Sequence, residues 1–310
     1  MKNIYEVRAS NKWKSTVVVS FFIVFVFLAA YVLTNAIGVY MGYRPGGAGF
    51  IGLALIISGI SSFVGYYFSD QIVLGISGAR PATKKKDLLF YSVCENLAIG
   101  SGIPTPKLFV IEDTAPNAFA TGRDTEHATI CATSGLISKL NRTELEGVIA
   151  HEMSHIKNYD TRLMSLVSVM VGLIALLGDW LVRMTWWGRG NRDSNDRNNA
   201  GSIFLIVGII FAILSPIIAQ LIQLAISRRR EFMADAGSVE ITRQPAGLIG
   251  ALQKISKDSE ALEAANKATA HLYIINPFKE KARGSVGWFS NLFNTHPPVI
   301  ERIRALKNMI

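Results

Sequence analysis

Long stretches without charged residues dominate the first quarter of the chain. No charged residue occurs between Lys14 and Arg44, or between Arg44 and Asp70. Within these stretches, residues 17–33 and 50–68 are each long enough to cross the hydrocarbon core of a bilayer as a helix, which takes about 20 apolar residues. The first is too long for the hydrophobic region of a signal peptide, and no convincing small-residue cleavage site follows it. We therefore expect both segments to be retained as membrane helices.

Two further apolar segments lie in the second half of the chain. Residues 163–182 carry a single charge, and residues 203–226 carry none. We expect these two segments to form a second membrane hairpin. The predicted organisation is an N-terminal membrane hairpin over residues 1–70, followed by a domain over residues 71–310 that the second hairpin interrupts.

Shorter elements make up the rest of the chain. Residues 84–100 have the pattern of an amphipathic helix that ends at a glycine. A second helix starts near Asn141, which can cap it, and a terminal helix is expected over residues 299–309. Strand character is found in residues 107–112, 118–121 and 127–133. We predict an α+β domain with a small antiparallel sheet beside the helix that starts near Asn141.

Composition and charge support the membrane interpretation. Half of the residues are hydrophobic and the mean hydropathy is +0.29, which is high for a soluble protein. Lysine and arginine are concentrated before the first apolar segment and after the second, with only Arg44 between them. The positive-inside rule then places both termini and the domain after residue 70 in the cytoplasm. The charges border membrane segments and form no aromatic-interleaved patch, so we expect a lipid bilayer and no nucleic acid as a partner.

A five-residue motif, His151-Glu-Met-Ser-His155, gives the chain its candidate chemistry. Positions i and i+4 share one face of a helix, so both imidazoles can reach one metal ion. Glu152 can face the same site, take a proton from a water on the metal and pass it to a leaving amine. The alternative, two surface histidines and a helix salt bridge, is disfavoured because a capped helix with an apolar stripe surrounds the motif.

A catalytic zinc takes a third protein ligand and keeps its fourth position for water. The chain has only five histidines, and the strongest candidate for the third ligand is Glu231. Asp235 follows at i+4, where its carboxylate can accept the free ring N–H of a ligand histidine and fix its tautomer. The alternative is an ordinary acidic pair that offsets three neighbouring arginines. Cys94 and Cys131 lie in no C-x-x-C pattern, so a pair of zinc thiolates is not expected. We expect one Zn²⁺ per chain.

Four motifs follow one another along the chain: Asn117-Ala-Phe-Ala-Thr-Gly122, His151-Glu-Met-Ser-His-Ile-Lys-Asn-Tyr-Asp160, Ser227-Arg-Arg-Arg-Glu-Phe-Met-Ala-Asp235 and Thr295-His-Pro-Pro298. In their order and spacing they resemble the HtpX family of membrane-embedded zinc metalloproteases, which are relatives of the CAAX prenyl proteases. The similarity extends from about residue 77 to the C-terminus. Phe232 departs from the pattern, since the resemblance leads us to expect Tyr there. The resemblance implies a zincin-like metalloprotease domain joined to transmembrane helices.

Two further site residues depend on the resemblance. It implies that Asn117 holds the substrate backbone with its side-chain amide, near an edge strand on which an extended peptide can pair. It also implies that His296 donates a hydrogen bond to the oxyanion that forms when water attacks the peptide carbonyl. From the sequence alone, Asn117 would be a turn residue and His296 a capping or loop residue. His127 and His271 have no supporting pattern and are expected to be structural or surface residues.

The resemblance implies an endopeptidase of the bacterial inner membrane with its active site in the cytoplasm. It implies a role in stress response and protein quality control, in which misfolded or damaged membrane proteins are cleaved. The rival among enzymes is a dedicated processing protease for a specific or lipidated substrate. The rival from another class is a catalytically silent membrane scaffold with structural zinc, and an intact Glu152 argues against it.

The candidate metal ligands constrain the second membrane hairpin. The two histidines precede residues 163–182 and Glu231 follows residues 203–226, so both segments must cross the bilayer together or not at all. The loop 183–200 would then face outside, although it carries four arginines and the positive-inside rule favours the cytoplasm for it. The alternative is a hairpin that lies partly on the membrane. We favour four crossings in total.

Overall fold

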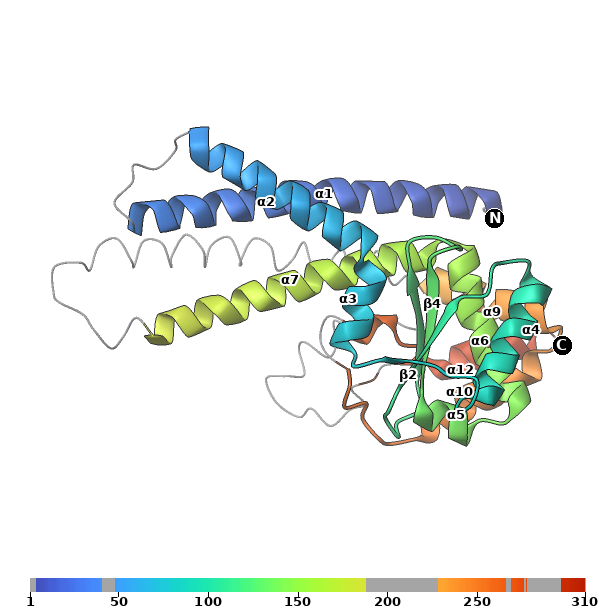
Figure 1. Cartoon of the computed structure of the whole chain (residues 1–310). Helices are drawn as coiled ribbons and strands as arrows, with labels where there is room; N and C mark the ends of the chain where they lie inside the picture. The colour runs from blue at the N-terminus through green and yellow to red at the C-terminus, as the bar shows by residue number, and fades with distance from the viewer. Residues whose placement is uncertain are drawn as a thin grey trace.

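The computed structural model describes residues 4–40, 48–187, 228–265, 269–275, 277 and 297–309. Within these ranges, three long helices extend from an α+β part of the molecule (Figure 1). The predicted membrane segment 203–226, most of the loop 183–200 and His296 lie outside the described residues.

The apolar segments that the structure describes are helical. α1 (Ile4–Tyr40) contains residues 17–33, and α2 (Ala48–Tyr67) contains almost all of residues 50–68. α3 (Ser69–Ile76) follows α2 after a bend of 76°. α7 (Asp160–Trp187) contains residues 163–182. The four helices therefore follow the hydrophobic pattern of the sequence.

The three long helices pack against one another close to the α+β part. At Gly65 of α2, a Cβ atom would lie 3.2 Å from the Phe22 ring of α1 and 3.4 Å from Val169 of α7, so a glycine permits this close approach. Buried apolar side chains of α1 and α7 surround the contact: Val18, Phe22, Phe25, Leu163, Leu166 and Met170. The N-terminal hairpin is therefore anchored on α7.

Among the described helices, no single helix is both long and apolar enough to cross a bilayer alone. The bent pair Ile51–Tyr67 and Ser69–Ile76 meets both criteria together, by length and composition alone. Thr16–Val32 of α1 is apolar but shorter. The four crossings expected from the sequence stay a prediction.

The sheet has four strands: β1 (Arg80–Pro81), β2 (Lys107–Ile111), β3 (Ala118–Gly122) and β4 (Ala128–Thr133). Their order is β1-β2-β4-β3, with β2 parallel to β4 and the other pairs antiparallel. The prediction of an antiparallel sheet was therefore wrong in part, because the sheet is mixed. After β2 the chain runs to the far edge to form β3, and the hairpin back from β3 sets β4 beside β2 in the same direction.

α6 (Arg142–Lys157) is the central helix of the α+β part. It packs on β3, on α4 (Leu88–Ser101), on α9 (Arg228–Thr242) and on α10 (Pro245–Lys257). Its fully buried apolar side chains join the main hydrophobic core with the sheet: Leu145, Val148, Ile149, Met153 and Ile156. The remaining described elements are α5 (Ser134–Lys139), the 3₁₀ helix η1 (Ala270–Leu272) and α12 (Val299–Lys307).

Local sequence explains where α6 begins. The Asn141 side chain accepts a hydrogen bond from the backbone N–H of Glu144, and the Glu144 carboxylate accepts one from the backbone N–H of Asn141, both at 2.9 Å. This reciprocal capping box satisfies two backbone donors at the helix start and confirms the predicted cap. At the other end, Tyr159 has a φ of 59°, a left-handed conformation that separates α6 from α7.

Candidate metal centre

α6 carries the H-E-x-x-H residues on a face that is buried against α9. His151 is fully buried, and Glu152 and His155 are 2 % and 4 % exposed. The two imidazole rings lie edge to face, with 4.8 Å between their centroids. The i, i+4 spacing therefore brings the two rings together, as predicted.

α9 supplies the third predicted ligand, Glu231. Its two carboxylate oxygens lie 3.7 Å from Nε2 of His151 and 3.6 Å from Nε2 of His155. One ligand atom from each of the three residues falls within 4.8 Å of the others. Ligands at about 2.1 Å from a tetrahedral zinc ion are roughly 3.4 Å apart, so these three side chains fit zinc with little rearrangement.

Each histidine has its own buried carboxylate partner. Nδ1 of His151 lies 3.0 Å from Asp235, and Nδ1 of His155 lies 3.0 Å from Asp160. A proton held on Nδ1 by a carboxylate leaves Nε2 as a bare lone pair for a metal. The structure thus brings the predicted Asp235 to the expected place and adds Asp160, which the sequence analysis did not identify as a site residue. The signal was available, because Asp160 ends the longer motif that starts with His151 and contains H-E-x-x-H.

The pKa of Glu152 is set mainly by its burial. Burial raises this pKa to about 7, although the nearby His155 lowers it. The backbone N–H of Ala120, on β3, also lowers the pKa of Glu152 and so acts against burial. A carboxyl group with a pKa near neutrality can take up and release a proton at the pH of the cell.

Arg302 of α12 is the second site residue that the sequence analysis missed. It is 1 % exposed and binds Asp235 through two hydrogen bonds of 2.9 and 2.7 Å. Its guanidinium also lies 3.4 Å from the His151 ring nitrogens and 3.5 Å from Glu231. Burial opposes ionisation of Asp235, but Arg302 outweighs it and holds the pKa of that carboxyl below its usual range. The terminal helix is therefore part of the metal centre.

Asn117 lies immediately before β3, which is an edge strand of the sheet. It is buried, and its side-chain amide donates a 3.0 Å hydrogen bond to the carbonyl of Ile275. On the outer side of β3, the carbonyl of Ala118 accepts from Ile274 N–H, and the N–H of Gly122 donates to Ser165 Oγ. A peptide that pairs with this edge must fit between these internal partners or displace them.

The remaining histidines behave differently. His271 is buried, with its Nε2 atom 3.2 Å from both Ser168 Oγ and the carbonyl of Met164. His127 lies at the β3–β4 turn, 2.7 Å from Asp124. Both histidines therefore make contacts within the fold, as expected from the sequence.

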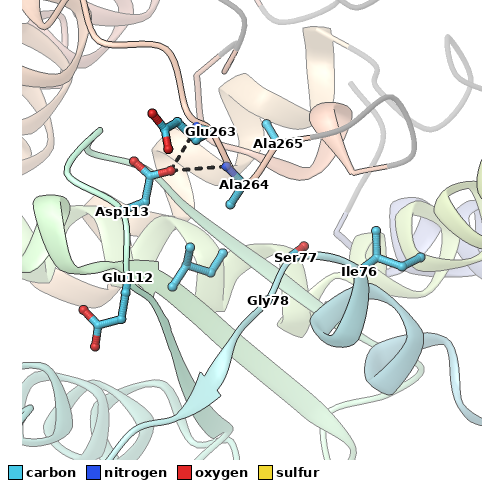
Figure 2. A pocket seen from close by; sticks show the side chains of 9 residues that line it. Ile76, Ser77, Gly78, Glu112, Asp113, Glu263, Ala264 and Ala265 are labelled. Atoms are coloured by element: carbon cyan, nitrogen blue, oxygen red, sulfur yellow. Dashed lines mark hydrogen bonds between the residues drawn. The ribbon is translucent and has the colours of Figure 1, made fainter.

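A surface pocket of about 520 Å³ lies away from the metal centre. Figure 2 shows its lining, which includes Asp113 and residues 76–78 and 263–265. Asp113 accepts hydrogen bonds from the backbone N–H groups of Glu263 and Ala264, at 2.9 and 3.2 Å. These bonds fasten the segment after α10 to the end of β2. None of the residues of the metal centre lines this pocket, so the pocket is not the candidate catalytic site.

Sequence comparison with known proteins gives matches over most of the chain. The model of peptidase family M48 matches residues 85–310, a range that contains every residue of the metal centre. The "Protease HtpX homolog" of Dictyoglomus thermophilum is 43% identical over 305 residues, which cover 98% of this chain and 94% of the relative. That of Ligilactobacillus salivarius is 40% identical over 99% of this chain and 100% of the relative. The crystal structure of S. mikatae Ste24p shares 19% identity, with a TM-score of 0.42, over 83% of this chain and 64% of that one.

Proposed function

Because the chain belongs to peptidase family M48 and is a metalloprotease, we propose that it is a zinc-dependent endopeptidase of the bacterial inner membrane. Its active site faces the cytoplasm, and its substrates are misfolded or damaged membrane proteins. The observation that carries the proposal is the convergence of His151, His155 and Glu231, with Glu152 beside them on the same helix.

The residues of the centre divide the chemistry among them. Zinc held by the three ligands would polarise the peptide carbonyl and lower the pKa of the attacking water. Glu152 takes a proton from this water and delivers it to the nitrogen of the leaving amine, for which a pKa of about 7 is well placed. Asp235 and Asp160 hold the two histidines with Nε2 towards the metal position.

Two roles in the proposal come from the family resemblance. His296 donates a hydrogen bond to the oxyanion, and Asn117 contacts the substrate backbone. The position of Asn117 immediately before the edge strand β3 supports its role, since the backbone N–H of Ala120 on this strand influences the pKa of Glu152. For His296 the support is the chain order, because it precedes by six residues the Arg302 that reaches the metal centre.

The residues on either side of the predicted membrane segments 163–182 and 203–226 support a second hairpin. The chain leaves the metal centre at Asp160, which contacts His155, and α9 starts at Arg228 and brings Glu231 back to the same histidine. A pair of membrane segments that crosses and returns fulfils this requirement. Four crossings with a cytoplasmic catalytic part are the topology that we propose.

The test is a comparison of wild type with Glu152→Gln, both purified in detergent. We expect one zinc per chain in each protein by elemental analysis. The wild type cleaves casein and several misfolded membrane proteins, and a chelator stops it. The variant cleaves none of them, because glutamine cannot accept the proton. Turnover by the variant at the wild-type rate would remove the assigned mechanism, whereas a single cleavage site in a single partner would favour a dedicated processing protease.

A further inference from the structure

Four side chains form a continuous row where α2 meets the α+β part. The guanidinium of Arg123, in the β3–β4 turn, lies 5.2 Å from the centre of the Tyr67 ring. The rings of Tyr67 and Tyr66 meet edge to face at 5.1 Å. The guanidinium of Arg162, near the start of α7, lies 5.1 Å from the Tyr66 ring. Two arginines from the α+β part thus hold the last two residues of α2 between them.

Arg162 forms no ion pair with a carboxylate among the described residues, and its one described hydrogen bond goes to the hydroxyl of Tyr66. Its Nε atom is buried and has no hydrogen-bond partner there. Arg123 lies 3.6 Å from Asp124 and donates to the carbonyl of Tyr67. The row therefore carries an excess of positive charge beside donors that an anion can use.

The row lies where an apolar surface ends. Large apolar side chains of α2 are exposed along its length: Leu53, Leu55, Ile56, Ile60, Phe63 and Val64. The exposed apolar surface continues to Tyr67 and Phe68, and the chain then bends by 76° into α3. Tyrosine rings and arginines at the end of an apolar helix are typical of the level of lipid headgroups. The anion available at that level is the phosphate of a lipid.

We propose that Arg123 and Arg162 bind the phosphate of an anionic phospholipid, with Tyr66 and Tyr67 at the level of its headgroup. The inference rests on the membrane location in the proposed function and does not depend on proteolysis. It fixes the height of the metal centre above the bilayer, because Arg162 lies two residues after the Asp160 that holds His155. A bound lipid would therefore anchor the start of α7 at the membrane surface.

The experiment measures which lipids stay bound to the full-length protein. The protein is purified in neutral detergent with equal amounts of phosphatidylglycerol and phosphatidylcholine of the same acyl chains, and native mass spectrometry counts the lipids retained. We expect the wild type to retain phosphatidylglycerol preferentially. The loss of each arginine should reduce this preference about fivefold, so Arg123→Gln/Arg162→Gln should abolish it. If the double variant lacks zinc or melts early, Arg162→Gln alone, which keeps the Arg123 contact, is used.

Two control variants separate binding from folding. Arg142→Gln removes an arginine at the opposite end of α6, on the order of 24 Å from the α6–α7 junction, and should keep the lipid preference. Arg304→Gln removes an exposed arginine of α12, outside the row, and should keep it too. The inference is overturned if the double variant retains phosphatidylglycerol like the wild type, or if either control loses it to the same extent.

Inorganic phosphate distinguishes a lipid from a free anion. We expect phosphate to leave the retained phosphatidylglycerol in place, and to leave the melting temperature of the protein in lipid-free detergent unchanged. If phosphate alone displaces the lipid and stabilises the protein, the site binds a free ion and the lipid assignment is wrong. Casein cleavage in the same samples reports on the proposed function separately, since the two arginines can lose the lipid while the metal centre stays intact.

Discussion

At the scale of single residues, the two histidines contact carboxylates that lie on either side of residues 163–226 in the sequence. Asp160 precedes residues 163–182, and Asp235 follows residues 203–226. Asp235 is also bound by Arg302, so its negative charge is matched inside the protein. Asp160 has Arg230 at 3.7 Å. Each carboxylate therefore contacts one histidine and one arginine, and the side chains of both groups are buried.

The first prediction concerns Asp160. We expect Asp160→Asn to weaken zinc binding by roughly 10–100-fold, because the amide no longer fixes the proton on Nδ1 of His155. Asp235→Asn should have an effect of the same order through His151. The measurement is a zinc titration against a competing chelator, with Asp258→Asn as the matched control, since Asp258 pairs with Lys139 away from the centre. Wild-type zinc affinity in Asp160→Asn would show that the contact with His155 is incidental.

The second prediction concerns Arg302. Arg302→Met leaves the Asp235 carboxylate buried and unpaired, which should lower the free energy of unfolding by roughly 3–5 kcal/mol. Arg302→Lys keeps the charge but loses the bidentate contact, so it should lower the free energy of unfolding by less than Arg302→Met does. Zinc adds positive charge to the same centre and should reduce both losses. Denaturant unfolding of the zinc-loaded and zinc-free proteins checks this, and equal stability of Arg302→Met and wild type without zinc would refute it.

The sequence alone identified most residues of the centre that lie in short motifs, although it did not identify Asp160. The i, i+4 spacing places His151 and His155 on one face of any helix, so their meeting follows from helix geometry. Arg302 was not identifiable in this way, because its contacts with Asp235 join residues 67 positions apart. An arginine in an amphipathic helix usually lies on the solvated face, as Arg304 of the same helix does. Only the packing of α12 against α9 and α10 turns Arg302 inward.

At the scale of elements, α6 is held at its beginning by a cap and along its length by packing. Asn141→Ala removes the side-chain acceptor for the backbone N–H of Glu144. We expect it to lower the free energy of unfolding by about 1 kcal/mol, with zinc stoichiometry unchanged, because ten residues separate the cap from His151. Thermal unfolding followed by tryptophan fluorescence measures the loss. Asn141→Asp, which can accept the same bond, is the control and should melt like the wild type.

Strands and sheet topology differ in how far the sequence determines them. The three strands predicted between residues 107 and 133 were confirmed, because β-branched and apolar residues bounded by turn residues mark them locally. β1, with two residues, is too short to leave a pattern. The parallel pairing of β2 with β4 depends on where β3 lies in space, which no local pattern encodes. The predicted antiparallel arrangement is correct for the β3–β4 hairpin but not for the pairing of β2 with β4.

At the scale of the whole molecule, the testable feature is the side of the membrane that the loop 183–200 faces. The topology that we propose places it outside the cytoplasm. A cysteine introduced at Ser194, in a background without Cys94 and Cys131, should react with an impermeant thiol reagent in intact cells. A cysteine introduced at Ser256, a residue on α10 in the catalytic part, is the control and should react only after lysis. Labelling of position 194 only after lysis would place the second hairpin on the cytoplasmic side.

The packing of α6 on α9 has a further consequence for how the protein is assembled. The two histidines precede residues 163–226 in the chain and Glu231 follows them, and the same division applies to Asp160 with Arg230 and to His151 with Asp235. A chain cut within residues 163–226 would leave the histidines on one fragment and the glutamate on the other. Zinc would then bind ligands from two polypeptides and hold them together. The free zinc concentration would set the fraction of the two fragments that is associated, and therefore the activity of the split enzyme.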